Sequence, residues 1–374
     1  MAGVLFFALN FSGPAFGLPL GPGLVKPFHL LALFLFLPFL LGTQTRLPQI
    51  PLSVGIFFLW VFGLSLLAGL ASGLGVLPEA AALNPLLLNY AFAFYLFLLG
   101  LSFARGRVLS GLRIAALAVL TLVLLKNCFY AEALQAYLAN PEAHPELPWF
   151  FGGGPNLEAS WLVMHGALFL GTPLFWPYWL LALGIAALYA SRAAFVLAFL
   201  LALWAFWTSR YRVLAFFTLG VLGAAGFVLV FALNPYLLSR FSQIGEDPGS
   251  LGRLALWGGA LRAFLDWPLG FGAGNAIHAA NAYAFSLRPE DNVHNYYLQV
   301  LLDFGIVGLF AWLWVLLTWL RRFRGDPLGV FLGLYFVGAL VQFRGADPLF
   351  WFMLGIYLGR EADAASDRTT DPGI

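Results

Sequence analysis

Cysteine is almost absent from the sequence, since Cys128 is the only one among 374 residues. A single cysteine excludes an internal disulfide bond and a zinc site built from several cysteine thiolates. Free cysteines in proteins usually behave as small apolar residues of the interior. We therefore expect Cys128 to be buried and to take no part in the chemistry.

Charge is scarce as well, because only 10% of the residues are Asp, Glu, Lys or Arg, whereas an ordinary soluble domain has about 25%. The net charge is only +2, and the basic residues are scattered along the sequence. Binding to the phosphates of a nucleic acid would need these residues clustered, so the sequence argues against a nucleic-acid-binding protein. Hydrophobic residues make up 61% of the chain and recur in runs of about twenty, the length that crosses a bilayer. The sequence predicts an all-α polytopic membrane protein in which residues 1–374 form one integral membrane domain.

We expect about twelve transmembrane helices from these runs. Their predicted ranges are 3–20, 27–42, 50–70, 82–104, 108–129, 159–171, 173–190, 193–208, 213–233, 296–320, 328–343 and 347–359. The first range contains Pro14 and Pro19 and lacks the charged start and the small-residue cleavage site of a signal peptide. The sequence has no strong internal repeat, which weakens the comparison with transporters built from two related halves.

Arginine and lysine in short loops mark the cytoplasmic side of a membrane protein. With about twelve helices, both termini lie in the cytoplasm, and residues 360–374 form a disordered, charged tail. The outer side then carries two longer polar segments, 130–158 and 234–293. The basic residues predicted to be cytoplasmic are Arg46, Arg105, Arg107, Arg113, Arg210, Arg212, Arg321, Arg322, Arg324, Arg360 and Arg368.

The outer segment 234–293 is expected to carry a short amphipathic helix that lies on the membrane surface. Apolar residues recur there at helical spacing, with Arg253 and Arg262 interleaved; they are Leu254, Leu256, Trp257, Leu261 and Phe264. The helix should end near Trp267, where a glycine-rich turn follows. Either the N–H groups of this turn, 270–274, hold an anion, or the turn is a tight connection between two helices.

Arg192 stands where a charge is costly, between the apolar runs 173–190 and 193–208 with almost no loop around it. It is either an interfacial anchor or, together with Arg253 at the same surface, a phosphate-binding group. Arginine suits the second role because its planar fork matches phosphate oxygens.

Two further charged residues leave alternatives open. Arg344 lies three residues before Asp347 and is either its ion-pair partner or a substrate contact. Asp303 falls within a predicted membrane helix, on the face opposite His294, and is therefore excluded as a direct partner of that histidine. We interpret Asp303 as a buried polar anchor for another helix, although an acid inside a membrane is also a candidate for function.

His294 opens the most informative stretch of the chain, in which a polar cluster passes into an apolar helix. On an ideal helix Gly305 and Gly308 lie within about 40° of His294, so that a glycine stripe would admit a neighbouring helix beneath it. The histidine is either a cap or a general base, since imidazole titrates near physiological pH. Its spacing from other possible ligands matches no zinc site, and we predict no metal.

Several of these residues together carry a resemblance to a known family. The pattern H-N-x9-G-x-x-G resembles, without a gap, the signature of the O-antigen ligase family. Ser191-Arg192-Ala-Ala resembles the Ser-Arg helix junction of that family, and the segment from Gly252 to Gly274 resembles the R-x-x-x-W-x-x-A…P-L-x-G-x-G stretch that precedes its histidine. The residues of the signature are His294, Asn295, Gly305 and Gly308.

The resemblance implies an inverting, metal-independent glycosyltransferase of the bacterial inner membrane, with its active site on the periplasmic side and no cofactor. The implied donor is a glycan linked to polyprenyl (undecaprenyl) diphosphate, and the implied acceptor is a lipid or glycolipid among the membrane lipids. His294 would be the general base that activates the acceptor hydroxyl, and Arg192 and Arg253 would bind the diphosphate. Asn295 and Arg344 are possible substrate contacts.

The same superfamily contains O-antigen polymerases and bacterial O-oligosaccharyltransferases. A ligase transfers the glycan to lipid A core, a polymerase to the next lipid-linked repeat, and an oligosaccharyltransferase to a Ser or Thr of a protein. The signature spacing favours a ligase, because no clear pair of R-x10-G loops is present and the polar tail is short. A solute or anion transporter is the alternative from another class, favoured by the helix count and by Asp303.

Overall fold

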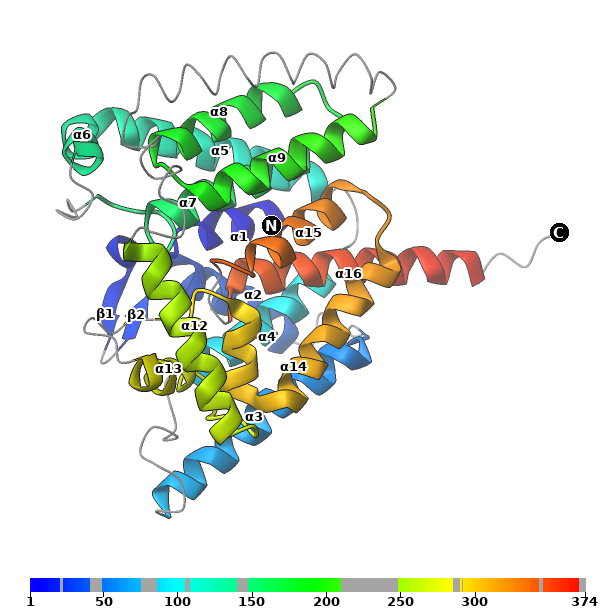
Figure 1. Ribbon diagram of the computed structural model, residues 1–374. Helices are drawn as coiled ribbons and strands as arrows, with labels where there is room; N and C mark the ends of the chain where they lie inside the picture. Colours follow the sequence, from blue (N-terminus) through cyan, green and yellow to red (C-terminus); the bar gives the residue numbers. More distant parts are fainter. Residues whose placement is uncertain are drawn as a thin grey trace. The chain divides into compact units, whose positions relative to one another are not determined.

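A computed structural model describes residues 1–20, 23–40, 49–74, 86–104, 108–139, 147–209, 248–284, 290, 292–342 and 346–369. Within these ranges, fourteen α-helices provide nearly all of the regular structure, and two short strands, β1 (Leu18–Leu20) and β2 (Gly23–Val25), form one antiparallel pair (Figure 1). The prediction of an all-α fold is confirmed for the part of the chain that the structure describes.

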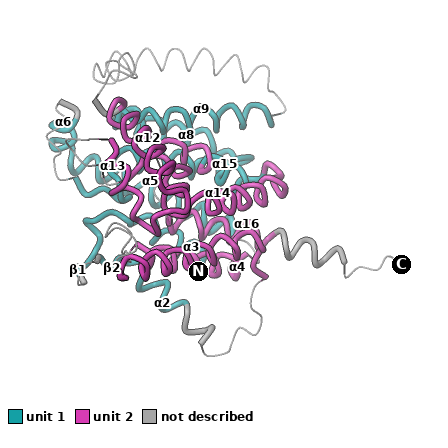
Figure 2. Tube along the Cα trace, turned by 60° about the horizontal axis from the view of Figure 1, so that its bottom comes forward, with its two compact units in different colours: residues 1–43, 107–244, 326–334 teal, residues 44–106, 245–325, 335–374 magenta. Residues whose placement is uncertain are grey.

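The chain divides into two compact units, each built from three separate stretches of sequence (Figure 2). Unit 1 comprises Met1–Thr43, Arg107–Ile244 and Asp326–Leu334, and unit 2 comprises Gln44–Gly106, Gly245–Gly325 and Tyr335–Ile374. The helices of unit 1 are α1 (Ala2–Leu9), α2 (Pro27–Leu40), α5 (Val108–Phe129), α6 (Ala131–Ala139), α7 (Pro155–His165), α8 (Phe175–Leu188) and α9 (Arg192–Trp207). Those of unit 2 are α3 (Leu52–Gly73), α4 (Leu86–Ser102), α12 (Pro248–Asp266), α13 (Ala276–Ala284), α14 (Tyr296–Arg322) and α16 (Pro348–Thr369), while α15 (Pro327–Gly338) contributes residues to both units.

Three of the described helices, α3, α5 and α14, are long and apolar enough to cross a bilayer, and α4, α8, α9 and α15 are apolar but shorter. Large apolar side chains point outward from them, among them Leu59 on α3, Ile114 on α5 and Phe310 on α14. Such a surface is unfavourable in water and is compatible with lipid. The protein is a membrane protein. The count of about twelve spans stays a prediction, and the expected helix 213–233 lies outside the described residues.

The first predicted span, 3–20, is wrong. Helix α1 has eight residues and ends at Leu9, so its length of about 12 Å falls short of the bilayer core. After α1 the backbone of Gly13 packs closely against Trp149, since a Cβ on the glycine would lie 1.9 Å from the Trp149 carbonyl oxygen. The strand pair β1–β2 follows, with its register fixed by Leu18 opposite Val25.

Two other expectations are also corrected. Cys128 is exposed and not buried, because it lies in the last turn of α5 beside Phe129, which is exposed as well. Helix α16 continues to Thr369, so the segment from residue 360 to that point is helical where the sequence predicts disorder. The reason is local: the sequence E-A-D-A-A-S-D contains three alanines, the residue with the strongest helix propensity.

Candidate functional site

His294 lies in a corner before helix α14 and not on the helix itself. Its φ is 54°, in the left-handed region that few non-glycine residues adopt, although histidine is enriched among them. The helix begins at Tyr296, and Asn295 is its N-cap, with Oδ1 accepting the N–H of Leu298 at 3.1 Å. The expected glycine stripe under His294 is wrong, because its geometry required one continuous helix from the histidine to Gly308.

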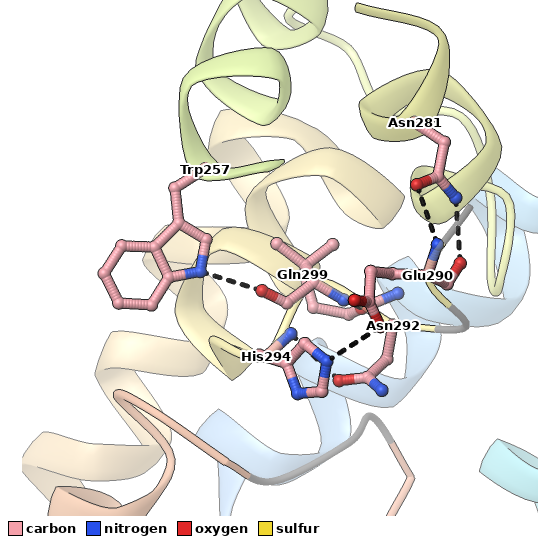
Figure 3. A network of polar contacts seen from close by, with 7 residues as sticks. Trp257, Asn281, Glu290, Asn292, His294 and Gln299 are labelled. Atoms are coloured by element: carbon pink, nitrogen blue, oxygen red, sulfur yellow. Dashed lines mark hydrogen bonds and ion pairs between the residues drawn. The ribbon is translucent and has the colours of Figure 1, made fainter. Parts of the chain in front are cut away.

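Hydrogen bonds on both sides hold this corner in place (Figure 3). The His294 N–H donates to Asn292 Oδ1 at 2.9 Å, and the Val293 N–H donates to Gln299 Oε1 at 3.3 Å. On the helix side, the N–H of Tyr296 donates to the carbonyl of Ala339 at 2.7 Å. A left-handed residue persists only where its surroundings determine it, and these bonds supply that support.

The imidazole of His294 faces a carboxylate. Its Nε2 lies 3.4 Å from Oε2 of Glu290, and the two side chains are 19% and 45% exposed, so that the pair is reachable from solvent (Figure 3). Asn281 on α13 fixes the backbone of Glu290 from both ends: its Oδ1 accepts the Glu290 N–H at 3.0 Å, and its Nδ2 donates to the Glu290 carbonyl at 2.8 Å. The site therefore contains a histidine with an adjacent, anchored carboxylate, which the sequence analysis did not identify.

Helix α12 contains Arg253 and contacts the corner through Trp257. It ends at Asp266, one residue before the Trp267 at which the amphipathic helix was predicted to end. The indole of Trp257 donates to the carbonyl of Val293 at 2.8 Å (Figure 3), and Arg253 precedes that tryptophan by four residues on the same helical face. The partly buried Arg253 thus lies one helical turn from a direct contact with the residue before His294.

Helix α12 is also tied to α13 at its far end. The hydroxyl of Tyr283 donates to the carboxylate of Asp266, and this hydrogen bond raises the pKa of the Tyr283 phenol. An apolar cluster fills the space between these helices, the corner and α14, and its buried members include Leu256, Ile277 and Val293. The corner is therefore part of the packed core of unit 2, while the side chains of His294 and Glu290 stay partly exposed.

Helix α14 is interrupted at Gly305, whose φ of 69° and ψ of −171° are not helical. The interruption leaves backbone groups without partners inside the helix, and other elements satisfy them. Phe271 and Gly272 donate to the carbonyls of residues 302 and 303 at 2.9 and 2.8 Å, and the indole of Trp60 donates to the carbonyl of Phe304 at 2.8 Å. The N–H of Ile306 donates to the Pro268 carbonyl at 3.2 Å.

The glycine-rich turn 270–274 is a connection between helices and not an anion site. Its N–H groups are already used, since Phe271 and Gly272 bind the broken helix and Ala273 donates to Ser65 Oγ at 3.0 Å. The turn approaches Gly305 so closely that a Cβ on this glycine would lie 2.4 Å from the carbonyl oxygen of Leu269. Of the two alternatives that the sequence left open, the structure supports the tight connection.

Asp303 is a buried anchor, as predicted. Its Oδ1 accepts the N–H of Ala276 at the start of α13 at 2.9 Å, and its Oδ2 accepts Nε2 of Gln299 at 3.0 Å. Because Gln299 also holds the backbone of Val293, a chain of hydrogen bonds runs from Asp303 to the residue before His294. Asp303 therefore helps to position the corner through Gln299. Its own hydrogen bonds satisfy the carboxylate, which explains how an ionisable group can be buried in α14.

Arg192 belongs to unit 1, where it is the first residue of α9. Ser191 is the N-cap, and its Oγ accepts the N–H of Ala194 at 3.4 Å. The preceding residue, Ala190, has a φ of 49° and forms the sharp turn between α8 and α9. The predicted junction with almost no loop is confirmed. Arg344 lies outside the described residues, and its proposed pairing with Asp347 stays a prediction.

Among the residues that the structure describes, no three histidine, cysteine or carboxylate side chains lie together as metal ligands would.

The comparison with protein families matches residues 177–313 to the family described as O-antigen ligase. The matched range begins within α8 and ends within α14, and it includes Arg192, Arg253, His294, Gly305 and Gly308. None of the curated proteins matches the sequence. The matched segment therefore contains the junction before α9, the surface helix α12 and the histidine corner.

Proposed function

We propose that this chain, whose residues 177–313 match the family described as O-antigen ligase, transfers a glycan from a polyprenyl (undecaprenyl) diphosphate donor to an acceptor hydroxyl at the periplasmic leaflet. The observation that carries the proposal is the corner in which the carboxylate of Glu290 lies 3.4 Å from Nε2 of His294. A carboxylate on one imidazole nitrogen orients the ring and stabilises the positive charge that forms when the ring takes a proton.

In this reaction His294 removes the proton of the acceptor hydroxyl. The acceptor oxygen forms a bond to the anomeric carbon of the donor sugar from the side opposite the diphosphate, and the bond between that carbon and the diphosphate oxygen breaks. The electron pair leaves with the diphosphate, and the configuration at the carbon is inverted. Arg192 and Arg253 stabilise the departing charge, a role that suits permanently charged planar groups.

The acceptor that the family signature favours is the lipid A core, which makes the chain an O-antigen ligase. A polymerase would use a second lipid-linked repeat, and an oligosaccharyltransferase a Ser or Thr side chain. One defined lipid-diphosphate donor, offered with lipid A core, a lipid-linked repeat and a Ser/Thr peptide in parallel, distinguishes the three. Product on lipid A core alone is the expected result, and product on another acceptor alone would reassign the enzyme within its superfamily.

The proposal as a whole is tested by removing the His294 side chain. We expect His294→Gly to lower turnover by about 10²–10⁴-fold, the usual contribution of a general base. Glycine is the informative replacement because it adopts a φ of 54° without strain, so that the melting temperature should not fall. Turnover by the purified protein in lipid measures the effect.

The matched control is His278→Ala. This histidine is exposed on α13 of the same unit and lies outside the corner, so its removal should leave turnover unchanged. Normal turnover by a folded His294→Gly protein would refute the proposed role of the histidine.

A further inference from the structure

Unit 1 contains a buried ion pair that the proposed reaction does not use. Lys126 near the end of α5 pairs with Glu158 in the first turn of α7, and the two side chains are only 4% and 0% exposed. The ammonium group of Lys126 also lies over the ring of Trp149, 4.5 Å from its centroid. Burying two charges is unfavourable unless further hydrogen bonds satisfy them, so a buried pair of this kind calls for an explanation.

Glu158 is the centre of a larger network. Its Oε2 accepts the N–H of Phe150 at 2.7 Å, and its Oε1 accepts the hydroxyl of Tyr189 at 2.8 Å. The Tyr189 hydroxyl also lies 2.7 Å from Oδ1 of Asn127. A phenol has one proton, so it donates to one of these two side-chain oxygens at a time. Tyr189 thereby links α5, α7 and the end of α8.

Tyr189 stands directly before the turn that presents Arg192. It is the C-cap of α8, Ala190 follows with its left-handed φ of 49°, and Ser191 and Arg192 begin α9. A left-handed alanine is strained, so the turn needs external support to keep this shape.

That support comes from α7 at two points. The hydroxyl of Tyr189 binds Glu158, and the hydroxyl of Ser191 donates to the carbonyl of Asn156 at 3.4 Å. Within the turn, the N–H of Ser191 donates to the carbonyl of Ala186 at 3.0 Å. Tyr189 and Ser191, which flank the left-handed Ala190, therefore hold the backbone before Arg192 against α7.

We propose that the Lys126–Glu158–Tyr189 network is the device that positions Arg192 for the donor diphosphate. In this view Lys126 holds the Glu158 carboxylate in place, Glu158 holds the Tyr189 hydroxyl, and the tyrosine fixes the turn from which the guanidinium extends. All three are positioning residues, because they act through Arg192. The inference rests on the diphosphate-binding role proposed for Arg192.

The test is the affinity for undecaprenyl diphosphate, measured at equilibrium without acceptor so that inactive variants remain measurable. Tyr189→Phe removes only the hydroxyl and should weaken binding about tenfold. Tyr178→Phe is the matched control: this tyrosine is also buried on α8, and its hydroxyl has no hydrogen-bond partner among the described residues. The control should bind like the unaltered protein. Asn127→Ala, a second and milder change, should weaken binding in the same direction as Tyr189→Phe.

A double-mutant comparison separates positioning from a general loss of structure. If the tyrosine acts through the arginine, Tyr189→Phe should have no further effect on binding in an Arg192→Ala background. Equal weakening in both backgrounds, or unaltered binding by Tyr189→Phe, would overturn the inference while leaving the role of Arg192 intact. Unaltered binding by Arg192→Ala would instead refute the proposed diphosphate site, and the inference with it.

Discussion

A histidine acts as a base only when its ring is held while its protonation state changes. In this protein the backbone of His294 is fixed by Asn292 and by the start of α14, and its ring is fixed by Glu290. The carboxylate is in turn anchored through its backbone by Asn281, on a helix that packs against α12 and α14. The packed core of unit 2 thus holds the elements that orient the imidazole ring of the proposed base.

Glu290→Gln tests this orientation. The change removes the negative charge and keeps the shape, so we expect kcat to fall roughly tenfold while the donor KM stays the same. Glu290→Asp keeps the charge on a shorter side chain and should recover part of kcat. Steady-state kinetics with purified protein measure both values. A rise in the donor KM at constant kcat would show that Glu290 contacts the donor and does not orient the histidine.

At the scale of single residues, the sequence identified the residue types with intrinsic chemistry and missed their supports. His294, Arg192 and Arg253 stand out because histidine and arginine have few structural reasons to occur at those positions. Glu290 lies four residues before His294. In a helix this spacing predicts that two side chains are neighbours, but in a loop it predicts no particular distance between them. Lys126 offered a clearer signal, because a lysine that is buried in a largely apolar helix requires a partner for its charge.

At the scale of elements, the main feature of the site is that α14 is two helical segments joined at Gly305. Irregular backbone at membrane depth is tolerated only where protein or water satisfies it. Here the turn 268–272 and Trp60 satisfy it, as their hydrogen bonds to residues 302–306 show. The sequence predicted that Gly305 matters for packing but assumed an unbroken helix, since a helical pattern contains no signal for where a neighbouring backbone will insert.

Gly305→Ala should therefore be strongly destabilising. The alanine would have to adopt a φ of 69° with extended ψ, a region that is essentially restricted to glycine, and its Cβ would meet the Leu269 carbonyl oxygen at 2.4 Å. We expect a loss of about 3 kcal/mol or more, measured by thermal or denaturant unfolding in detergent. Gly63→Ala is the matched control, because this α3 glycine has open space around it and alanine favours a helix. Equal stability of the two variants would contradict the interruption of α14.

At the scale of the whole molecule, the sequence predicted the class of protein and not its internal partition. Hydrophobic runs and their lengths predict helices one at a time, because each run is local. The two units are each assembled from three stretches, and within a unit the contacts between stretches are distant in sequence: in unit 2, a Cβ on Gly100 of α4 would lie 2.3 Å from the carbonyl oxygen of Phe352 of α16. Such pairings depend on shape complementarity between surfaces, which hydropathy does not encode.

The predicted orientation of the chain in the membrane gives a test at this scale. Arg262 on α12 is exposed and lies in the segment assigned to the periplasm, whereas Arg324 is exposed after α14 in a loop assigned to the cytoplasm. In a Cys128→Ala background, Arg262→Cys should react with a membrane-impermeant maleimide in intact spheroplasts, and Arg324→Cys should react only after permeabilisation. Both positions are exposed arginines, so that a difference in labelling reports the side of the membrane and not local accessibility. Labelling of Arg324→Cys alone in intact spheroplasts would place the histidine corner in the cytoplasm, away from a periplasmic donor, and would refute the proposed site of transfer.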